Sequence, residues 1–332
     1  MLIHPSIQST PHNTASWLNS RHIYSSHHVA YDEPKTLRSL AMIMTGCCIN
    51  LVLSGGGVRG YVHIGVLKVL REYGIEVDTV SGVSMASIIG AMIAMEKDPD
   101  TITNDCLGWF ANPLKMLSLI QLPFSSMIKP KGYRKLFQSV YGTLQIEDLW
   151  KKYLCLTVNM TKAKEHVLDS GYIYNAVMGS AGLPMMASPL ISEGDMHVDG
   201  CVLNTMPVDI AKQRYGGEVI CVQIARDSTY PRDTEHSIFP SSWQILRRML
   251  NPFKKNLNVP SLTEIMTKTI QMANFKKTND MAELADVVIA PDISSVKPSD
   301  HAKVKEIAEL GYQEAKIQIE KWLANKKAKD EI

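Results

Sequence analysis

The sequence predicts an α/β protein, a three-layer sandwich in which helices cover both faces of a largely parallel central sheet. From Ile49 onward, short apolar runs alternate with longer segments whose apolar residues recur at helical spacing. Alternating strands and helices are typical of parallel sheets, because parallel neighbours need a crossover connection. The chain has 332 residues, of which 45% are hydrophobic, which is enough for one large domain or two small ones.

The first predicted strand, residues 49–53, runs directly into a glycine-rich loop, and a helix is expected from about Gly60. Glycines have no Cβ, so the backbone can adopt positive φ and leave N–H groups free to bind negative charge. Such a loop at a helix N-terminus is a candidate site for a phosphate or for the oxyanion of an acyl intermediate. The loop consists of Gly55, Gly56, Gly57, Val58, Arg59 and Gly60.

A serine lies where the second predicted strand, residues 79–82, meets the next helix, residues 84–95. A serine on such a strand-to-helix turn has its hydroxyl exposed above the sheet edge, as in a nucleophile elbow. The small residues Gly82 and Ala86 on either side of Ser84 let the turn pack closely. The alternative is that Ser84 is only a helix N-cap. The glycine loop upstream favours the nucleophile.

A serine nucleophile needs a base, and the sequence offers two arrangements. Asp199 ends the predicted strand 196–199 and is followed by Gly200, so its side chain could act directly on the serine. His197 or His301 could instead complete a Ser-Asp-His triad. Taken alone, Asp199 and Gly200 are equally consistent with an ordinary turn.

These three motifs, in this order, resemble the signatures of the patatin-like phospholipases, and they are most similar to those of bacterial members and of the catalytic domain of neuropathy target esterase. The resemblance extends from Asn50 to Gln313. Two positions depart from the family pattern. Ala86 stands where the family usually has Gly, and Cys201 stands where it usually has Gly or Ala. Both departures keep the residue small. Supporting stretches are residues 63–67, 180–184, 188–190, 285–292 and 309–312.

The resemblance implies a Ser-Asp dyad, with Ser84 as nucleophile and Asp199 as general base. The N–H groups around Gly56, Gly57 and Val58 would form the oxyanion hole. The expected activity is that of a serine acyl hydrolase that cleaves fatty-acyl esters of phospholipids or lysophospholipids through an acyl-enzyme, with no cofactor and no metal. Arg59 would orient the loop or contact a lipid phosphate.

The same resemblance leaves the histidines without a catalytic role. His63, in the first helix, is expected to be buried or to cap the helix, whereas His197 and His301 are expected to be structural or solvated.

Two other functions fit parts of the sequence. Gly55, Gly57 and Gly60 match the dinucleotide-binding pattern, and Asp78 lies at about the distance at which that pattern needs an acidic residue. The strand before Asp78 is brief, however, and runs straight into the serine turn. The second alternative is a non-catalytic lipid-binding module on the same fold.

Charge and cysteine content narrow the class of protein further. The formal net charge of +2 is too small to indicate a nucleic-acid partner. The six cysteines follow neither metal-ligand nor disulfide spacing, so we expect reduced thiols. We see no signal peptide and no transmembrane segment, and we therefore expect a cytoplasmic protein that is a candidate for peripheral membrane contact.

We expect three regions along the chain. Residues 1–46 lack periodicity and are interpreted as a disordered tail. Residues 47–225 form the catalytic core, and residues 226–332 complete the same domain. Two segments that combine apolar and basic residues, 107–128 and 243–255, are candidates for contact with a lipid surface.

Overall fold

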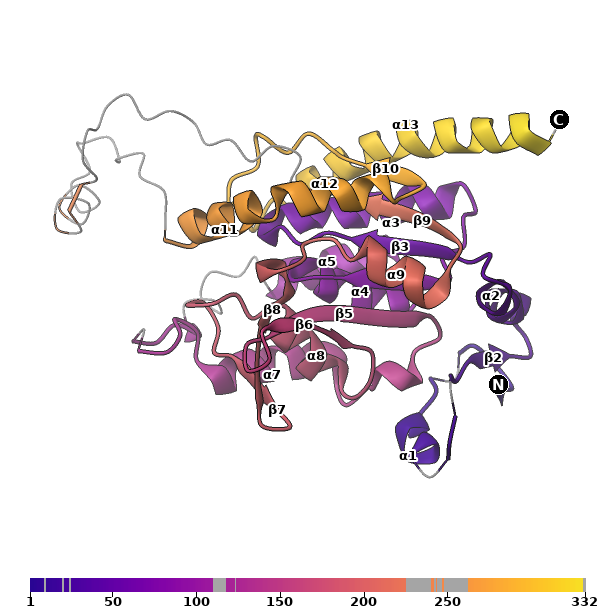
Figure 1. Cartoon of the computed structure of the whole chain (residues 1–332), viewed down its shortest axis with the longest axis horizontal. Helices are drawn as coiled ribbons and strands as arrows, with labels where there is room; N and C mark the ends of the chain where they lie inside the picture. Colours follow the sequence, from indigo (N-terminus) through magenta and orange to yellow (C-terminus); the bar gives the residue numbers. More distant parts are fainter. Residues whose placement is uncertain are drawn as a thin grey trace.

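The computed structural model centres on a mixed sheet of eight strands, with a separate two-stranded sheet near the N-terminus (Figure 1). It describes residues 1–8, 10–19, 21–23, 25–109, 118–122, 124–224, 240–241, 243, 247 and 262–330. The strands of the main sheet are β3 (Ile49–Leu53), β4 (Thr79–Gly82), β5 (Lys152–Asn159), β6 (Lys164–Leu168), β7 (Leu190–Ser192), β8 (Asp195–Asp199), β9 (Glu218–Val222) and β10 (Val287–Ile289).

Helices surround the sheet, and the three-layer α/β class expected from the sequence is confirmed. The α-helices after residue 50 are α3 (Val62–Glu72), α4 (Met85–Ala94), α5 (Pro99–Trp109), α7 (Pro130–Tyr141), α8 (Ile173–Ser180), α9 (Val208–Tyr215), α11 (Leu262–Ala273), α12 (Phe275–Glu283) and α13 (Val304–Asp330). Short 3₁₀ turns cover Gly57–Tyr61, Ile146–Asp148 and Gly200–Val202.

The sheet is parallel over most of its width and antiparallel at one side. Its order is β10-β9-β3-β4-β5-β8-β7, with β6 paired to β5 as well. All pairs from β10 to β5 are parallel, whereas β8, β7 and β6 pair in antiparallel fashion. The carboxyl ends of β3 and β4 therefore lie side by side at one edge, where both candidate motifs begin.

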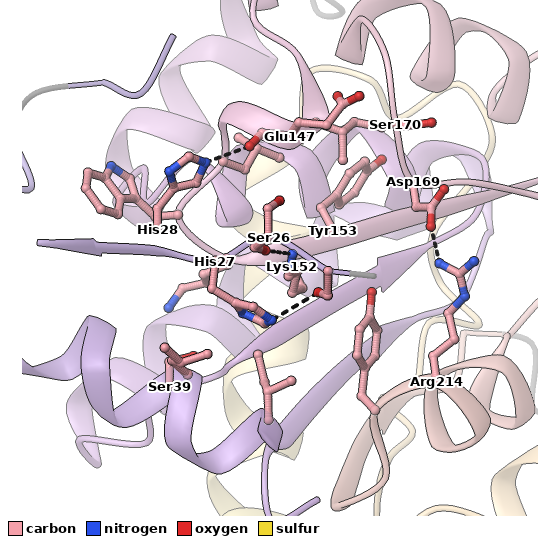
Figure 2. A pocket seen from close by; sticks show the side chains of 18 of the residues that line it. Ser26, His27, His28, Ser39, Glu147, Lys152, Tyr153, Asp169, Ser170 and Arg214 are labelled. Atoms are coloured by element: carbon pink, nitrogen blue, oxygen red, sulfur yellow. Dashed lines mark hydrogen bonds and ion pairs between the residues drawn. The ribbon is translucent and has the colours of Figure 1, made fainter. Parts of the chain in front are cut away.

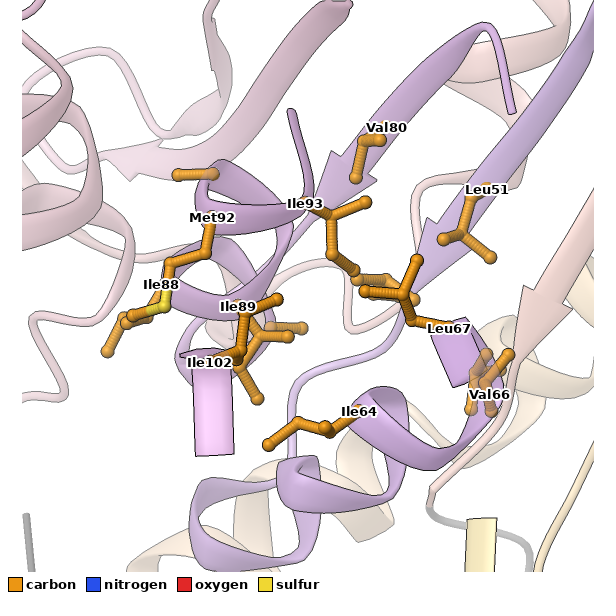
Figure 3. Packing of buried hydrophobic residues seen from close by; sticks show 14 of the residues in the cluster. Leu51, Ile64, Val66, Leu67, Val80, Ile88, Ile89, Met92, Ile93 and Ile102 are labelled. Atoms are coloured by element: carbon orange, nitrogen blue, oxygen red, sulfur yellow. The ribbon is translucent and has the colours of Figure 1, made fainter. Parts of the chain in front are cut away.

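Strand β3 shows how the two faces of the sheet are covered. Leu51 and Leu53 belong to the larger core, which α3, α4 and α13 also build, whereas Val52 points to the opposite face and packs with Val208 of α9. Figure 3 shows the larger core, where residues of α3 and α4 meet Val80 of β4. This alternation follows from the two-residue repeat of a strand, with apolar residues on both faces.

Helices α3 and α13 cross at a distance that leaves no room for side chains. A Cβ on Gly65 would lie 1.8 Å from the carbonyl oxygen of Ala308, and one on Gly311 would lie 2.1 Å from that of Val62. The two glycines thus let the backbones touch. The C-terminal helix is in this way built into the layer that covers the sheet.

We expected residues 1–46 to be a disordered tail, whereas the structure gives most of them defined positions. Strands β1 (Leu2–His4) and β2 (His28–Ala30) pair in parallel, and helices α1 (Thr14–Leu18) and α2 (Pro34–Thr45) flank them. The N–H of Thr14 donates to Asp148 at 3.0 Å, and the His28 ring contacts the Glu147 carbonyl at 2.7 Å. These partners are more than a hundred positions away, so local composition carries no sign of them.

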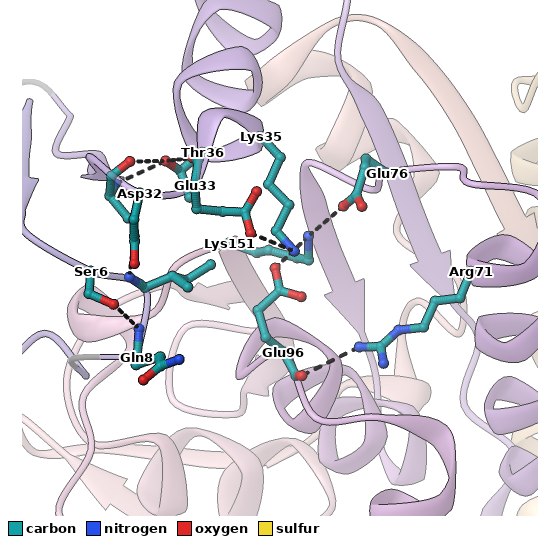
Figure 4. A network of polar contacts seen from close by, with 12 residues as sticks. Ser6, Gln8, Asp32, Glu33, Lys35, Thr36, Arg71, Glu76, Glu96 and Lys151 are labelled. Carbon is teal, nitrogen blue, oxygen red and sulfur yellow. Dashed lines mark hydrogen bonds and ion pairs between the residues drawn. The ribbon is translucent and has the colours of Figure 1, made fainter.

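Polar contacts line the base of the sheet near this N-terminal segment (Figure 4). Lys151 forms ion pairs with Glu96 at 2.8 Å and Glu76 at 3.8 Å, and Arg71 donates to the carbonyl oxygens at the end of α4. Within the segment, Asp32 accepts from the N–H of Ile7. These contacts join the loops that follow α3 and α4 to the residue just before β5.

The candidate interfacial segment 243–255 lies outside the described residues, except for Trp243 and Arg247, both of which are exposed. Of segment 107–128, positions 110–117 and 123 also lie outside them. In the described ranges, no helix is both long and apolar enough to cross a bilayer.

The α3–α13 crossing gives a test of the fold. Gly65→Ala should lower the free energy of unfolding by about 1–3 kcal/mol, because the added methyl meets the α13 backbone and the helices must separate. Gly108→Ala in α5 is the matched control, since nothing lies within 4 Å of its Cβ position. Urea unfolding of both variants measures the effect, and equal stabilities would contradict the close crossing.

Candidate active site

Ser84 occupies a strained turn between β4 and α4. Its φ of 58° and ψ of −130° lie in a region that non-glycine residues rarely adopt, at a typical cost of about 1–3 kcal/mol. A Cβ on Gly82 would lie 2.5 Å from the Ala86 carbonyl oxygen, so the turn requires glycine there. At Ala86 the methyl is accommodated in the core, so the departure at this position leaves the turn intact.

Hydrogen bonds hold the backbone of Ser84 from two sides. Its N–H donates to the Ser180 hydroxyl at 3.2 Å, and that hydroxyl donates to the Leu156 carbonyl of β5 at 2.7 Å. The Ser87 hydroxyl donates to the Ser84 carbonyl at 2.6 Å. The Ser84 side chain is half-buried, so its hydroxyl remains accessible while its backbone is fixed.

The glycine loop passes directly beside Ser84. A Cβ on Gly55 would lie 2.3 Å from the Cys201 sulfur and 3.1 Å from the Ser84 Cβ, so only glycine fits between them. Gly57 has a φ of 59° and is exposed, with open space at its Cβ position. Among the residues that the structure describes, none accepts a hydrogen bond from the backbone N–H of Gly56 or Gly57. These two donors are therefore free for a ligand.

The other residues of the loop hold it in place. Val58 is buried in the larger core, and a Cβ on Gly60 would meet Met85 at 2.9 Å. The Arg59 guanidinium donates twice to the Val296 carbonyl, both times at 3.3 Å, and its partial burial lowers its pKa. Of the two roles expected for Arg59, the structure supports orientation of the loop.

Asp199 is fully buried at the end of β8. Its Oδ1 accepts from the Cys201 N–H at 2.8 Å, and its own N–H donates to the Gly182 carbonyl at 3.0 Å. Oδ2 has no well-aligned hydrogen-bond partner within the described ranges. Burial raises the pKa of Asp199 to about 6, against the opposing effect of the nearby Ser84 hydroxyl and the Cys201 N–H. The buried Asp199 carboxylate thus lies within reach of the hydroxyl of the candidate nucleophile.

Cys201 fills the space between Asp199 and the glycine loop. Burial and the Asp199 carboxylate both raise the pKa of its thiol well above the usual value. The thiol is therefore protonated at neutral pH and does not compete with Ser84 as a nucleophile. Gly200 beside it is required, because a Cβ there would lie 2.4 Å from the Leu156 carbonyl oxygen.

The histidines that the sequence offered as candidate bases are not joined to the Ser84 and Asp199 side chains. Within the described part of the chain, neither His197 nor His301 hydrogen-bonds to Ser84 or Asp199. The buried His197 ring contacts the Thr157 hydroxyl at 3.2 Å, and His301 lies on an exposed turn before α13. His63 is fully buried against the Ser54 carbonyl, and burial lowers its pKa to about 4, so its ring is neutral. The geometry favours the dyad over the triad.

Comparison with known proteins places this arrangement in a family. The family model for patatin-like phospholipases matches residues 51–212, the segment that contains the loop, the serine turn and Asp199. The chain is 30% identical, over 94% of its length, to neuropathy target esterase sws of Drosophila melanogaster. The chain belongs to the patatin-like phospholipase family.

Other patatin-like relatives match as well. Lysophospholipase NTE1 of Eremothecium gossypii is 32% identical over 82% of this chain. The chain spans 24% of the length of the Drosophila protein and 18% of that of the fungal one, about a quarter or less of the relatives it matches. Among solved structures, VipD from Legionella pneumophila aligns over 82% of this chain and 67% of its own, with 14% identity and a TM-score of 0.42, a likeness too remote to indicate function.

The C-terminal part of this patatin-like chain supports the Asp199 turn from outside the matched segment. The Asn274 amide, between α11 and α12, donates to the carbonyls of Cys201 at 3.1 Å and Val202 at 3.2 Å. The sequence pattern missed Asn274 and gave Ser180 no role of its own. Both are single polar residues whose role depends on contacts between segments that are distant in the sequence.

The raised pKa of Asp199 predicts a pH-dependent gain in stability when the charge is removed. An acid whose folded pKa is raised destabilises the fold above that pKa, and the cost vanishes below the unfolded value. Asp199→Asn should therefore raise the free energy of unfolding at pH 8 by up to about 3 kcal/mol, which corresponds to the shift from 3.8 to about 6.

The gain should fall between pH 6 and pH 4 and disappear at lower pH. Asp280→Asn, an exposed change on α12, serves as the matched control and should alter stability little at any pH. Urea unfolding at a series of pH values measures both variants. A gain for Asp199→Asn that is the same at pH 4 and pH 8 would contradict the raised pKa.

Proposed function

We propose that this patatin-like chain is a serine acyl hydrolase that cleaves fatty-acyl esters of phospholipids or lysophospholipids. The observation that carries the proposal is the meeting of three groups at one sheet edge: the strained Ser84, the buried Asp199 carboxylate and the free N–H groups of Gly56 and Gly57. Each group is costly or unsatisfied on its own, and an acyl-transfer reaction uses all three.

The proposed reaction has two halves. The Ser84 hydroxyl attacks the ester carbonyl while Asp199 accepts its proton, and the oxyanion binds the free N–H groups of the glycine loop. The alcohol leaves with the proton that Asp199 returns, and an acyl-enzyme remains. Water then attacks the acyl-enzyme, again losing its proton to Asp199, which returns the proton to the Ser84 oxygen as the bond to the acyl group breaks and the fatty acid is released. A carboxylate with a pKa of about 6 is a better base than an exposed one and is still ionised at neutral pH.

The substrate class comes from the relatives. Their names are those of an esterase, of phospholipase-domain proteins and of lysophospholipases, and the shared chemistry is hydrolysis of a lipid acyl ester. The segment that matches the family, residues 51–212, contains the glycine loop, Ser84 and Asp199, so we assign this chain the same class of substrate.

The position of Asp78 disfavours nucleotide binding by the glycine loop. A dinucleotide fold needs an acidic residue at the carboxyl end of a strand, beside the loop. Asp78 lies instead just before β4, at the opposite end of the sheet, where its buried carboxylate accepts from the Ile49 N–H at 2.8 Å. Burial of the Asp199 carboxylate beside Ser84 lowers the stability of the fold. A non-catalytic lipid-binding module would gain nothing from that burial.

The dyad predicts a simple pattern of variant activities. Ser84→Ala should reduce hydrolysis of a p-nitrophenyl ester to background and abolish labelling by a fluorophosphonate. Asp199→Asn should reduce hydrolysis by about a hundredfold or more, because the amide cannot accept the proton. His197→Ala and His301→Ala are the controls and should retain most of the activity. A folded histidine variant without activity would replace the dyad with a triad.

We also propose that the chain contacts membranes peripherally through the loop 118–128. Phe124 and Leu122 on this loop are 95% and 75% exposed, and backbone hydrogen bonds join the loop to Met185, which is also exposed. Met185 lies just upstream of β7 and β8, the strands that lead to Asp199, so the surface is near the site. Exposed apolar residues of this size are typical of interaction surfaces.

The charge around this loop suits an anionic bilayer. No Asp or Glu occurs from Cys106 to Ile146, whereas Lys129, Lys131, Arg134 and Lys135 follow the loop directly. Apolar side chains flanked by bases are the pattern of interfacial binding, in which each base near the surface adds about 1 kcal/mol.

The double variant Leu122→Ser, Phe124→Ser should therefore bind anionic vesicles at least about tenfold more weakly, because it loses its inserted apolar area. Its hydrolysis of a soluble short-chain ester should stay close to that of the unmodified chain. Tyr31→Ser, at an exposed position at the base of the sheet, is the control. Vesicle co-sedimentation measures binding, and equal binding by the double variant and the control would refute the proposal.

A further inference from the structure

A cavity of about 650 Å³ lies between the N-terminal segment and the base of the sheet (Figure 2). Residues of α2 and of positions 25–28 form one wall, and residues 146–153, with Arg214 and Tyr215, form the other. Lys152 pairs with Thr79 at the start of β4, which lies about 16 Å along the strand direction from Ser84, at roughly 3.3 Å per residue. The cavity is therefore separate from the candidate active site.

The charged groups of the cavity leave one cation without a carboxylate. Asp169 is ion-paired with Arg214, and the Glu147 carboxylate accepts from the Gly171 N–H at 2.8 Å. The Lys152 ammonium, in the described part of the chain, is bonded only to the Ser26 carbonyl and forms no ion pair. An ammonium has three donors, so two of them remain for a ligand.

The surroundings of Lys152 favour an anion further. Burial lowers the pKa of Lys152 to about 8, although Asp169 and Glu147 act to raise it. Burial and the Lys152 charge lower the pKa of the neighbouring His27 to about 4, so that ring is neutral at pH 7. An anion placed against Lys152 would restore the stability of its charged form, because a partly desolvated charge gains most from a partner.

The remaining lining mixes polar side chains, such as Thr36 and Ser39, with a group of apolar ones. Leu40, Ile43 and Met44 lie along α2, Leu18 comes from α1, and Leu149 faces them from the other wall. The volume is within the range of about 300–1,000 Å³ that is typical of small-molecule sites. A ligand that fits both parts has one anionic group and an apolar chain.

We infer that this cavity binds a single-chain amphipathic anion, with its carboxylate or phosphate on Lys152 and its apolar chain along α2. This cavity lies at the opposite end of the strands from Ser84, and the inference does not depend on the proposed function. Carboxylate and phosphate head groups share the chemistry that Lys152 would recognise, and competition between fatty acids and alkyl phosphates separates the two sources.

Photo-crosslinking tests the inference on the unmodified full chain. A diazirine analogue of palmitate should label peptides from residues 36–44 or 146–153, besides any label near Ser84. Excess laurate or dodecyl phosphate should suppress this labelling, whichever head group is preferred. Acetate should not suppress the labelling, because it lacks the apolar chain. Dodecyl maltoside should not suppress it either, because it carries no charge. Absence of label in these peptides, or equal competition by the uncharged amphiphile, would overturn the inference.

Variants of Lys152 and Ser39 test where the head group of the ligand binds. Lys152→Gln should weaken labelling of these peptides about tenfold, since a charge-assisted contact is lost, and Lys152→Arg should retain it. Lys164→Gln, at the exposed first residue of β6, is the matched control. Ser39→Phe fills the cavity from α2 and should abolish the labelling independently of charge. Undiminished labelling in both Lys152→Gln and Ser39→Phe would refute the site.

Discussion

The close approach of three turns at one sheet edge is the constraint on which the candidate site depends. A Cβ on Gly55 would lie 2.3 Å from the Cys201 sulfur, so the glycine loop can approach the Asp199 turn only with glycine there. A Cβ on Gly82 would lie 2.5 Å from the Ala86 carbonyl oxygen, inside the Ser84 turn itself, and one on Gly200 would lie 2.4 Å from the Leu156 carbonyl oxygen of β5. The first glycine thus lets two motifs meet, and the other two let the Ser84 and Asp199 turns adopt their tight conformations.

The site works against the stability of the fold, as functional sites often do. Ser84 holds an unfavourable backbone conformation, and Asp199 holds a carboxylate away from water, which raises its pKa to about 6. These costs are borne by the surrounding core, to which β3, β4 and the helices α3 and α4 contribute many fully buried apolar side chains. The rigid core fixes the positions of the reacting groups, and the accessible Ser84 hydroxyl faces out of it.

The two ends of the parallel strands carry different chemistry. At the carboxyl ends lie the glycine loop and the proposed dyad of Ser84 and Asp199, together with the exposed apolar loop 118–128, which is followed by basic residues. At the amino ends the N-terminal segment closes over a cavity with one ammonium, Lys152, that forms no ion pair among the described residues. The parallel sheet separates these regions, because strands and crossovers place all like ends on the same side.

The sequence by itself determined the fold class, the alternation of strands and helices from Ile49 onward, and the motifs that contain Ser84 and Asp199. These features depend on local periodicity and on glycines at fixed spacing, which a single chain displays directly. Only the tertiary structure decided the rest. The order of residues 1–46 comes from contacts such as Thr14 with Asp148, and the support of the Asp199 turn comes from Asn274. The pKa of Asp199 and the charge on Lys152 likewise depend on burial, and burial is a property of packing between segments that are distant in the sequence.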